Sequence, residues 1–287
     1  MSASMSNVTE ALLYAEHLLL GGIFDDEEAF LALPAQYGAI EELAELEAFD
    51  HGCALADLQG MGALLVSGNG AQPLVTSACA NEQLAVGECR FGAVVTGDGS
   101  LASVPLVART GDNEYLLWDP TERGMMLEPW LGFLADIEQD GFKPFDGAVI
   151  EDVSDSLVPL LLWGPDASSV IGDYVAGKSA LPQPGQVRSV NLDRIACLVA
   201  NIAHMGSDCY LVMVPPKAAR VLWRSFLSFT QVVPVGHRAL LRKAQTRLPW
   251  FDRLLDGDRL EISARQLVRW GLARTDGGYV GARALGA

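Results

Sequence analysis

A tight turn between two apolar runs is the feature that most constrains the fold of this chain. Phe91 to Thr96 and Ala102 to Arg109 are β-branched and apolar, and Asp98-Gly99 between them supplies the positive φ angles of a hairpin turn. Residues 114–118 predict a third strand, which Asp119-Pro120 should end, and residues 127–137 repeat apolar side chains at helical spacing. A meander backed by a helix buries a small core, so this segment predicts a folded α+β unit.

The length of the chain, 287 residues, suffices for two ordinary domains. Glycine, proline and acidic residues near 141–156 indicate the boundary. We therefore predict an α+β protein of two domains: an acidic antiparallel meander with helices over residues 1–148, and a mixed α/β domain with basic C-terminal helices over residues 149–287. In the second domain we expect a helix over 193–205 and, at the end, a helix capped by Ser263 followed by a two-stranded wing.

Charge is distributed unevenly along the chain. Residues 1–150 hold 24 acidic and 4 basic side chains, a net charge of −20, whereas residues 151–287 hold 12 acidic and 16 basic ones, a net charge of +4. A strongly acidic surface repels nucleic acid and anionic lipid and speeds encounter with basic partners. Solubility alone is the alternative explanation of such a charge, and composition does not decide between the two.

Cysteine usage and the absence of long apolar runs indicate a cytoplasmic protein. No run approaches the roughly 18 apolar residues of a spanning helix, and the N-terminal residues lack the pattern of a signal peptide. The cysteines at 53, 79, 89, 197 and 209 have apolar neighbours and form no CxxC pair. We expect reduced cysteines in the core and no membrane partner.

Motifs of catalysis are weak in this sequence. Residues 172–179 match GxxxxGK[ST], but Pro182 and Pro184 forbid the helix that must follow a phosphate-binding loop. The turn at residues 68–70 is glycine-rich, and we interpret it as a hairpin turn. The four histidines show no metal-ligand spacing, and no GxSxG elbow is present. We therefore predict no enzymatic activity, no catalytic residue, no cofactor and no metal.

The basic C-terminal third is a second candidate for a binding site. Between Lys217 and Arg283 there are 13 basic and 5 acidic residues. A helix with a wing bearing Arg265, Arg269 and Arg274 would suit a phosphate backbone. The simpler use of these arginines is to pair with acidic residues of the first half, or of a second copy in a homodimer.

Part of the N-terminal half resembles a known family. GAVVTGDGSLASVPLVAR, EYLLWDP and LEPWLGFLADIEQ, which fall between Gly92 and Gln139, are similar to the end of SMI1/KNR4-like immunity domains. In those domains a meander ends in a helix with an aromatic-x-x-Phe-Leu pattern, here Trp130, Phe133 and Leu134. The size of the chain and its basic second half are also typical of immunity proteins paired with nuclease toxins of type VI secretion.

The resemblance implies a toxin inhibitor that acts by stoichiometric protein–protein interaction with a cognate basic antibacterial toxin, and binds no nucleic acid. Two alternatives stay open: a winged-helix-like nucleic-acid-binding or regulatory protein, and an enzyme whose active site is assembled from distant residues. The expected contact surface is an exposed acidic face of the first helices. Its candidate residues are Asp25, Asp26, Glu27, Glu28, Glu41, Glu42, Glu45 and Glu47.

Overall fold

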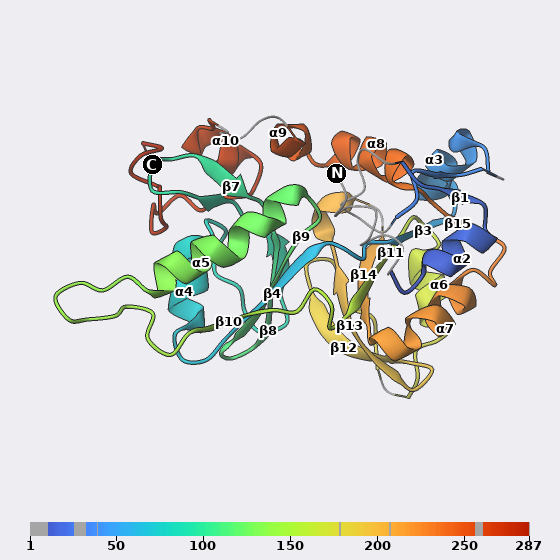
Figure 1. Ribbon diagram of the computed structural model, residues 1–287, viewed down its shortest axis with the longest axis horizontal. Coiled ribbons are helices and arrows are strands. Elements are labelled where there is room, and N and C mark those ends of the chain that lie inside the picture. The colour runs from blue at the N-terminus through green and yellow to red at the C-terminus, as the bar shows by residue number, and fades with distance from the viewer. Residues whose placement is uncertain are drawn as a thin grey trace. The chain divides into compact units, whose positions relative to one another are not determined.

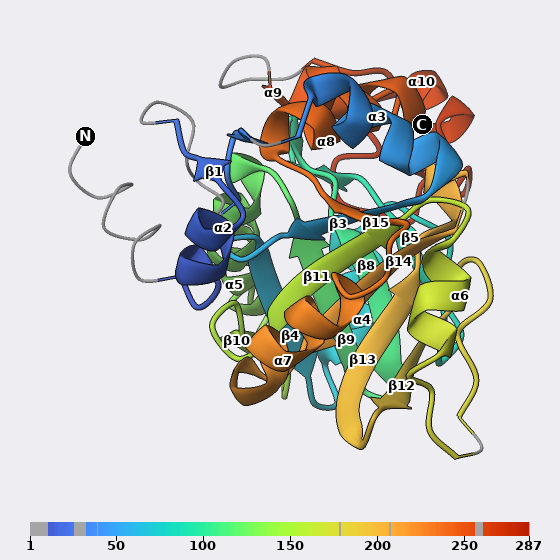
Figure 2. The ribbon, with the colours of Figure 1, turned by 90° about the vertical axis from the view of Figure 1, so that its right-hand side faces the viewer.

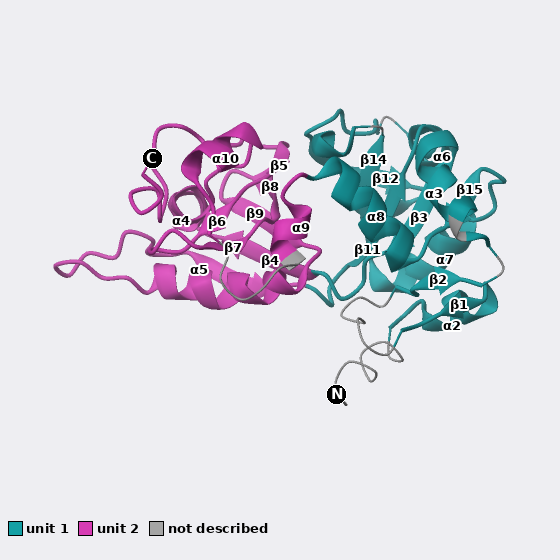
Figure 3. Cartoon of the chain, turned by 90° about the horizontal axis from the view of Figure 1, so that it is seen from above, with its two compact units in different colours: residues 1–61, 154–248 teal, residues 62–153, 249–287 magenta. Residues whose placement is uncertain are grey.

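The computed structural model describes residues 11–25, 33–38, 40–177, 179–206, 208–255 and 261–286. The chain forms two compact α+β units, each made of two separate segments (Figure 3). Unit 1 consists of residues 1–61 and 154–248, and unit 2 of residues 62–153 and 249–287. The α+β class predicted from the sequence is confirmed. The units do not follow the contiguous halves 1–148 and 149–287, because strands distant in the sequence pair with each other.

Unit 1 is built on a six-stranded sheet with the strand order β12-β13-β14-β11-β3-β15 (Figure 2). All neighbours are antiparallel except β15, which runs parallel to β3. The central strands are continuous apolar runs, as expected for strands covered on both faces. The strands are β3 (Cys53–Asp57), β11 (Val158–Trp163), β12 (Val187–Leu192), β13 (Ile195–Asn201), β14 (Cys209–Val214) and β15 (Val232–Pro234), beside a separate pair, β1 (Gly22–Ile23) and β2 (Gln36–Tyr37).

Helices pack against both faces of this sheet. The core on one face joins Leu55, Leu160 and Val212 of the strands to Leu222 and other apolar residues of α6 and α7. On the other face, Phe49 of α3 meets Trp163 edge-on, with ring centroids 5.0 Å apart. The helices are α2 (Tyr14–Leu19), α3 (Glu42–His51), α6 (Ala167–Gly172), α7 (Pro216–Phe226) and α8 (His237–Arg247), with a 3-10 turn, η2 (Ala203–Met205).

The predicted helix over 193–205 is wrong, because most of this segment is strand β13. Asp193 and Arg194 have φ angles of 45° and 70° and form the turn of the β12–β13 hairpin. Two successive positive φ angles are typical of a type I′ turn, which here contains no glycine. The apolar positions 195, 198, 199 and 202 fit a helical period. In the structure, Cys197 and Val199 join the core cluster of unit 1 and Leu198 between them does not, which is the alternation of a strand.

Unit 2 contains a five-stranded antiparallel sheet with the order β10-β4-β9-β8-β5 (Figure 1). The strands of the predicted meander occur here, and the turn at Asp98-Gly99 joins the short strands β6 and β7 as expected. The strands are β4 (Gly62–Ser67), β5 (Cys89–Phe91), β6 (Val94–Val95), β7 (Leu101–Ser103), β8 (Leu106–Gly111), β9 (Glu114–Asp119) and β10 (Val149–Asp152).

Two helices, α4 and α5, supply much of the core on one face of this sheet. Leu74 and Val75 of α4 and Leu131 of α5 join Leu64 and Leu117 of the strands in one cluster. The helices are α4 (Ala71–Ala78), α5 (Leu127–Ala135), α9 (Phe251–Leu255) and α10 (Ala264–Arg269), with a 3-10 helix, η1 (Glu122–Met126). None of the helices in the described ranges of the chain is long and apolar enough to cross a membrane.

The glycine-rich turn at residues 68–70 is followed directly by α4, so its interpretation as a hairpin turn is wrong. Its glycines are required by close backbone contact. A Cβ at Gly68 would lie 2.2 Å from the carbonyl oxygen of Gly147, and one at Gly70 would lie 2.4 Å from that of Phe145. Because the chain around residues 145–148 fills this space, the turn offers no cradle for a phosphate.

The C-terminal segment contains the helix capped by Ser263, whose hydroxyl accepts from the Gln266 amide as predicted. The described residues after it, 270–286, contain turns and no strand, so the predicted wing is wrong. Arg274 is buried, and its guanidinium donates to the carbonyl oxygens of Thr76, Cys79, Asn81 and Gly278. This arginine therefore joins the C-terminal segment to the end of α4 and is not available to a phosphate backbone.

Basic and acidic segments of the sequence meet within unit 1. Residues 1–61 hold 12 acidic and no basic side chains, and residues 154–248 hold 5 acidic and 10 basic ones, which gives unit 1 a net charge of −7. The Arg238 guanidinium lies 2.7 Å from Asp25 Oδ2, and Lys243 Nζ lies 2.6 Å from Asp50 Oδ1. The uneven charge along the sequence is therefore partly compensated inside one unit.

Replacement of Arg274 by lysine should lower the free energy of unfolding by about 2–4 kcal/mol, because an ammonium cannot serve four carbonyl acceptors in a fixed plane. Urea unfolding measures the change. The exposed Arg269→Lys is the matched control and should stay within about 0.5 kcal/mol of the wild type. Equal stabilities of the two variants would contradict the role assigned to Arg274.

Candidate functional site

A buried carboxyl group, Asp119, lies at the end of strand β9 in unit 2. It is fully inaccessible to solvent. Its Oδ1 accepts from the amide and the hydroxyl of Thr121 at 2.8 and 2.7 Å, and its Oδ2 accepts a short hydrogen bond from the Ser103 hydroxyl. Burial raises the pKa of Asp119, and the hydrogen bonds from Ser103, Thr121 and the Val104 amide oppose that rise. We call Ser103, Asp119 and Thr121 the Asp119 site.

Local sequence explains how these three residues meet. Pro120 cannot donate to a sheet ladder, and β9 ends just before it, as the sequence predicted. Thr121 then caps η1, since its hydroxyl accepts from the Arg123 amide. Ser103 is the last residue of β7, the strand that follows the Asp98-Gly99 turn. The Asp119 site thus ties the end of one hairpin strand to the turn after another.

A second buried polar network lies in unit 1. The imidazole of His17 is wholly buried, with Nδ1 2.8 Å from the Tyr37 hydroxyl and Nε2 3.1 Å from Asp57 Oδ2. Because a carboxylate only accepts, Nε2 must carry the proton; in the neutral ring, Nδ1 then accepts from Tyr37. Trp223 of α7 packs edge-on against the imidazole at 5.0 Å. The two hydrogen bonds and the ring contact together hold the imidazole in one orientation.

Next to His17, Glu16 forms the strongest ion pair of α2. Its carboxylate accepts from Arg224 Nε and Nη2, both at 2.8 Å, and lies 3.2 Å from Arg220 Nε. The hydrogen bond from Arg224 is the main cause that holds the pKa of Glu16 below its usual value. Because both arginines come from α7, this pair docks the N-terminal helix on the second segment of unit 1.

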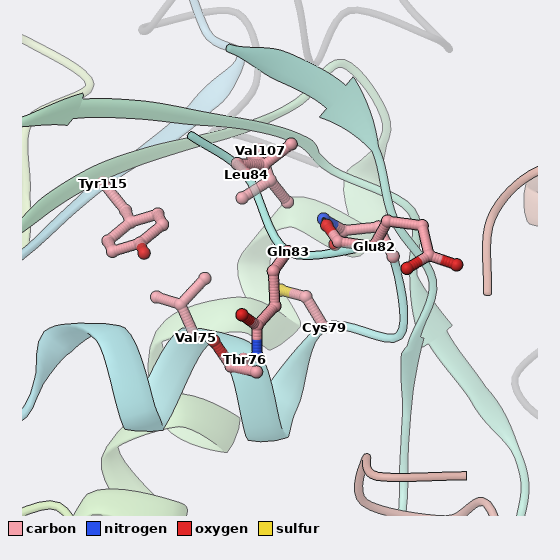
Figure 4. A pocket seen from close by; sticks show the side chains of 9 residues that line it. Val75, Thr76, Cys79, Glu82, Gln83, Leu84, Val107 and Tyr115 are labelled. Atoms are coloured by element: carbon pink, nitrogen blue, oxygen red, sulfur yellow. The ribbon is translucent and has the colours of Figure 1, made fainter. Parts of the chain in front are cut away.

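Among the described residues of unit 2 lie two hollows. One, drawn in Figure 4, lies between the end of α4 and Tyr115 of β9, and its volume of about 10 Å³ holds no more than a single water molecule. The Glu82 carboxylate points away from Tyr115 there. The other is an open groove of about 330 Å³ beside the end of α5. No group of three or more possible metal ligands occurs among the described residues.

The acidic residues proposed as a contact surface do not form one exposed face. Glu45 is buried, and its carboxylate accepts from the amides of Tyr37 and Gly236 at 2.9 and 2.8 Å. Asp25 is half-buried against Arg238. Glu41 and Glu47 are exposed, one on each side of the buried Glu45. Asp26, Glu27, Glu28 and the side chain of Glu42 lie outside the described residues.

The GxxxxGKS match and the cysteines have the local structure that the sequence predicted. Gly172 ends helix α6, and residues 179–186 form no helix, so the GxxxxGKS match lacks the context of a phosphate-binding loop. Lys178 lies outside the described residues. All five cysteines are free and buried, as predicted, and burial raises the pKa of Cys53, Cys79, Cys89 and Cys197 to about 12.

Comparison with known proteins identifies the family. The GCVT N-terminal domain profile matches residues 13–248, which is most of the chain and includes strands of both units. The chain belongs to the GCVT N-terminal domain family. Similar curated proteins are the aminomethyltransferases of Rubrobacter xylanophilus, 25% identical over 74% of this chain and 54% of the relative, and of Geobacillus kaustophilus, 25% identical over 71% and 55%.

A solved structure shows the same fold. The glycine cleavage system aminomethyltransferase T from Bartonella henselae superposes with a TM-score of 0.75 at 20% identity, over 96% of this chain and 73% of that one. The chain spans about half the length of the curated relatives that it matches.

Family membership corrects the main functional hypothesis. The resemblance to SMI1/KNR4-like immunity domains is wrong, and with it the interpretation as a type VI secretion-associated toxin inhibitor with a toxin partner. The expectation that the chain is not an enzyme is also wrong, since its family contains aminomethyltransferases. The alternative of an enzyme whose site is assembled from distant residues is the one that agrees with the family.

Replacement of Asp119 by alanine should lower the free energy of unfolding by about 3 kcal/mol, because Ser103, Thr121 and the Val104 amide would lose their buried acceptor. Thermal and urea unfolding measure the loss. Asp112→Ala, in the exposed turn between β8 and β9, is the control and should change little. A stable Asp119→Ala variant would show that these donors find other partners.

Stability should also depend on Glu16 in acid. Since its folded pKa is lowered, Glu16 stabilises the fold above its unfolded pKa near 4.5, and this contribution disappears as the pH falls through the folded value. Glu16→Gln should cost about 1–2 kcal/mol at pH 7, where the arginines are partly exposed to solvent. The difference from wild type should shrink below pH 4; a constant difference from pH 7 to pH 3 would contradict the assignment.

Proposed function

We propose that this chain transfers an aminomethyl or related one-carbon group to a reduced folate. The observation that carries the proposal is the family match over residues 13–248, because it includes the sheets of both units and not one isolated motif. The relatives that it resembles are named aminomethyltransferases, and the family is folate-dependent. We expect the chain to act together with the other proteins of an enzyme system of the glycine cleavage type.

In this proposal the Asp119 site is a positioning element of unit 2. Asp119 and Ser103 are wholly buried, so neither touches a substrate in the described structure. Their hydrogen bonds fix the segment after β7 and the turn after β9, and burial raises the pKa of the Asp119 carboxyl. The segment after β7 and the turn after β9 would then present their backbone to the substrate in one fixed arrangement.

We also propose a cytoplasmic location for this activity. The five cysteines are free, buried thiols. Cys53 and Cys197 belong to the apolar core of unit 1, and burial there protects a thiol from oxidation. A reducing compartment suits such residues and suits reduced folates.

Binding and turnover test the proposal separately. Calorimetry with tetrahydrofolate should give a dissociation constant on the order of 1 μM to 1 mM, the range of ordinary substrates. Incubation with tetrahydrofolate and an aminomethylated donor should release a one-carbon folate product, detected by chromatography. Absence of both binding and product from correctly folded protein would overturn the proposal.

The role of Asp119 has its own measurement in the same assay. Asp119→Asn keeps the size of the side chain but replaces one acceptor by a donor, so we expect a fall of about tenfold or more in turnover with a smaller change in KM. Turnover equal to that of the wild type would contradict the positioning role of Asp119. Asp112→Asn is the control and should behave as wild type.

A further inference from the structure

Helix α5 carries two apolar stripes, and only one of them is fully buried in the core of unit 2. Leu127, Leu131 and Leu134 recur at positions i, i+4 and i+7 and are buried. A second stripe, Met126, Trp130 and Phe133, has the same spacing along another face of the helix. Trp130 packs partly against the core, whereas Met126 and Phe133 stay exposed, so the fold of unit 2 uses this second stripe only in part.

Two of the three side chains of this second stripe are open to solvent. Met126 and Phe133 are 54% and 61% exposed, and Met125, just before the helix, is 75% exposed. The rings of Trp130 and Phe133 stack with centroids 5.6 Å apart, so they present one flat apolar area. We call Met125, Met126, Trp130 and Phe133 the α5 surface. Contiguous exposed methionine and aromatic side chains are typical of protein interfaces.

Carboxylates surround the α5 surface. Five acidic residues in and around the helix are exposed, and among the described residues none of the five lies within ion-pair distance of a lysine or arginine. Like charges crowded on one short segment cost stability when no cation is near. We call these five residues the acid rim: Glu122, Glu128, Asp136, Glu138 and Asp140.

The open groove of unit 2 begins where the α5 surface ends. Leu134 and Ile137, directly after Phe133, line it together with Phe145 and Val280. The connection after α5, which extends away from the helix in Figure 1, carries a further exposed apolar side chain, Phe142, which is 67% exposed. A groove of about 330 Å³ with apolar walls accommodates a large side chain of a partner.

We propose that the α5 surface is the docking site of another protein, whose contact patch is apolar in the centre and carries lysines or arginines around it. The negative charge of the acid rim favours a basic partner over a second copy of this chain. A second copy of this chain would bring the same five carboxylates against the first set, whereas a basic rim would neutralise them and speed encounter. One large apolar side chain of the partner enters the groove beside Ile137. The proposal does not depend on the transferase activity.

Site-specific photocrosslinking in the native host cell tests this proposal on the full chain. p-Benzoylphenylalanine at position 133 should give an adduct with a different protein, and mass spectrometry should find the crosslinked peptide to hold an apolar residue and at least two lysines or arginines. The same probe at Leu19, which is 76% exposed on α2, is the matched control and should not give this adduct.

Charge reversal supplies the second part of the test. Glu128→Lys combined with Asp136→Lys should lower the adduct yield about tenfold at low salt, while thermal unfolding shows that the variant is folded. Absence of an adduct, an adduct with a second copy of the chain, or a crosslinked peptide without basic residues would each overturn the proposal. An unchanged yield in the charge-reversed variant would overturn it as well.

Discussion

Buried charges that join distant segments hold each unit together. In unit 1 the Glu45 carboxylate accepts from the amides of Tyr37 and Gly236, residues almost 200 positions apart. In unit 2 the Arg274 guanidinium donates hydrogen bonds to carbonyl oxygens around the end of α4 and in the C-terminal turn. A charge in a low-dielectric interior is tolerated only when such partners satisfy it, so each of these residues requires both segments to be in place.

Local signals predicted a large part of the fold. The Asp98-Gly99 turn, the end of β9 before Pro120 and the Ser263 cap act over a few residues, and each occurs as expected. The segment at 193–205 was ambiguous because its apolar residues fit two periods, and only pairing with β12 and β14 decides for a strand. The division into units was beyond local reasoning, since β3 pairs with β11 across about a hundred residues.

The candidate site was less accessible to sequence reasoning than the fold. Glu45 lies in an acidic run and was expected at the surface, yet its neighbours in space come from the other end of the unit. Asp119 was recognised only as a strand end, although a carboxylate after the apolar run Leu116-Leu117-Trp118 is a sign of burial. The false resemblance arose from a meander followed by a helix, an arrangement that unrelated families share, whereas the family itself is recognised over 236 positions, from 13 to 248.

The interrupted course of the chain has a consequence for its synthesis. Strand β3 lies between β11 and β15 in the sheet, but both of its neighbours follow it by at least a hundred residues. At a translation rate of about 5–20 residues per second, the apolar run of β3 has left the ribosome for roughly 5–20 s before β11 exists. During that time both edges of β3 are unpaired, so the sheet of unit 1 closes only after the second segment of the unit has been synthesised.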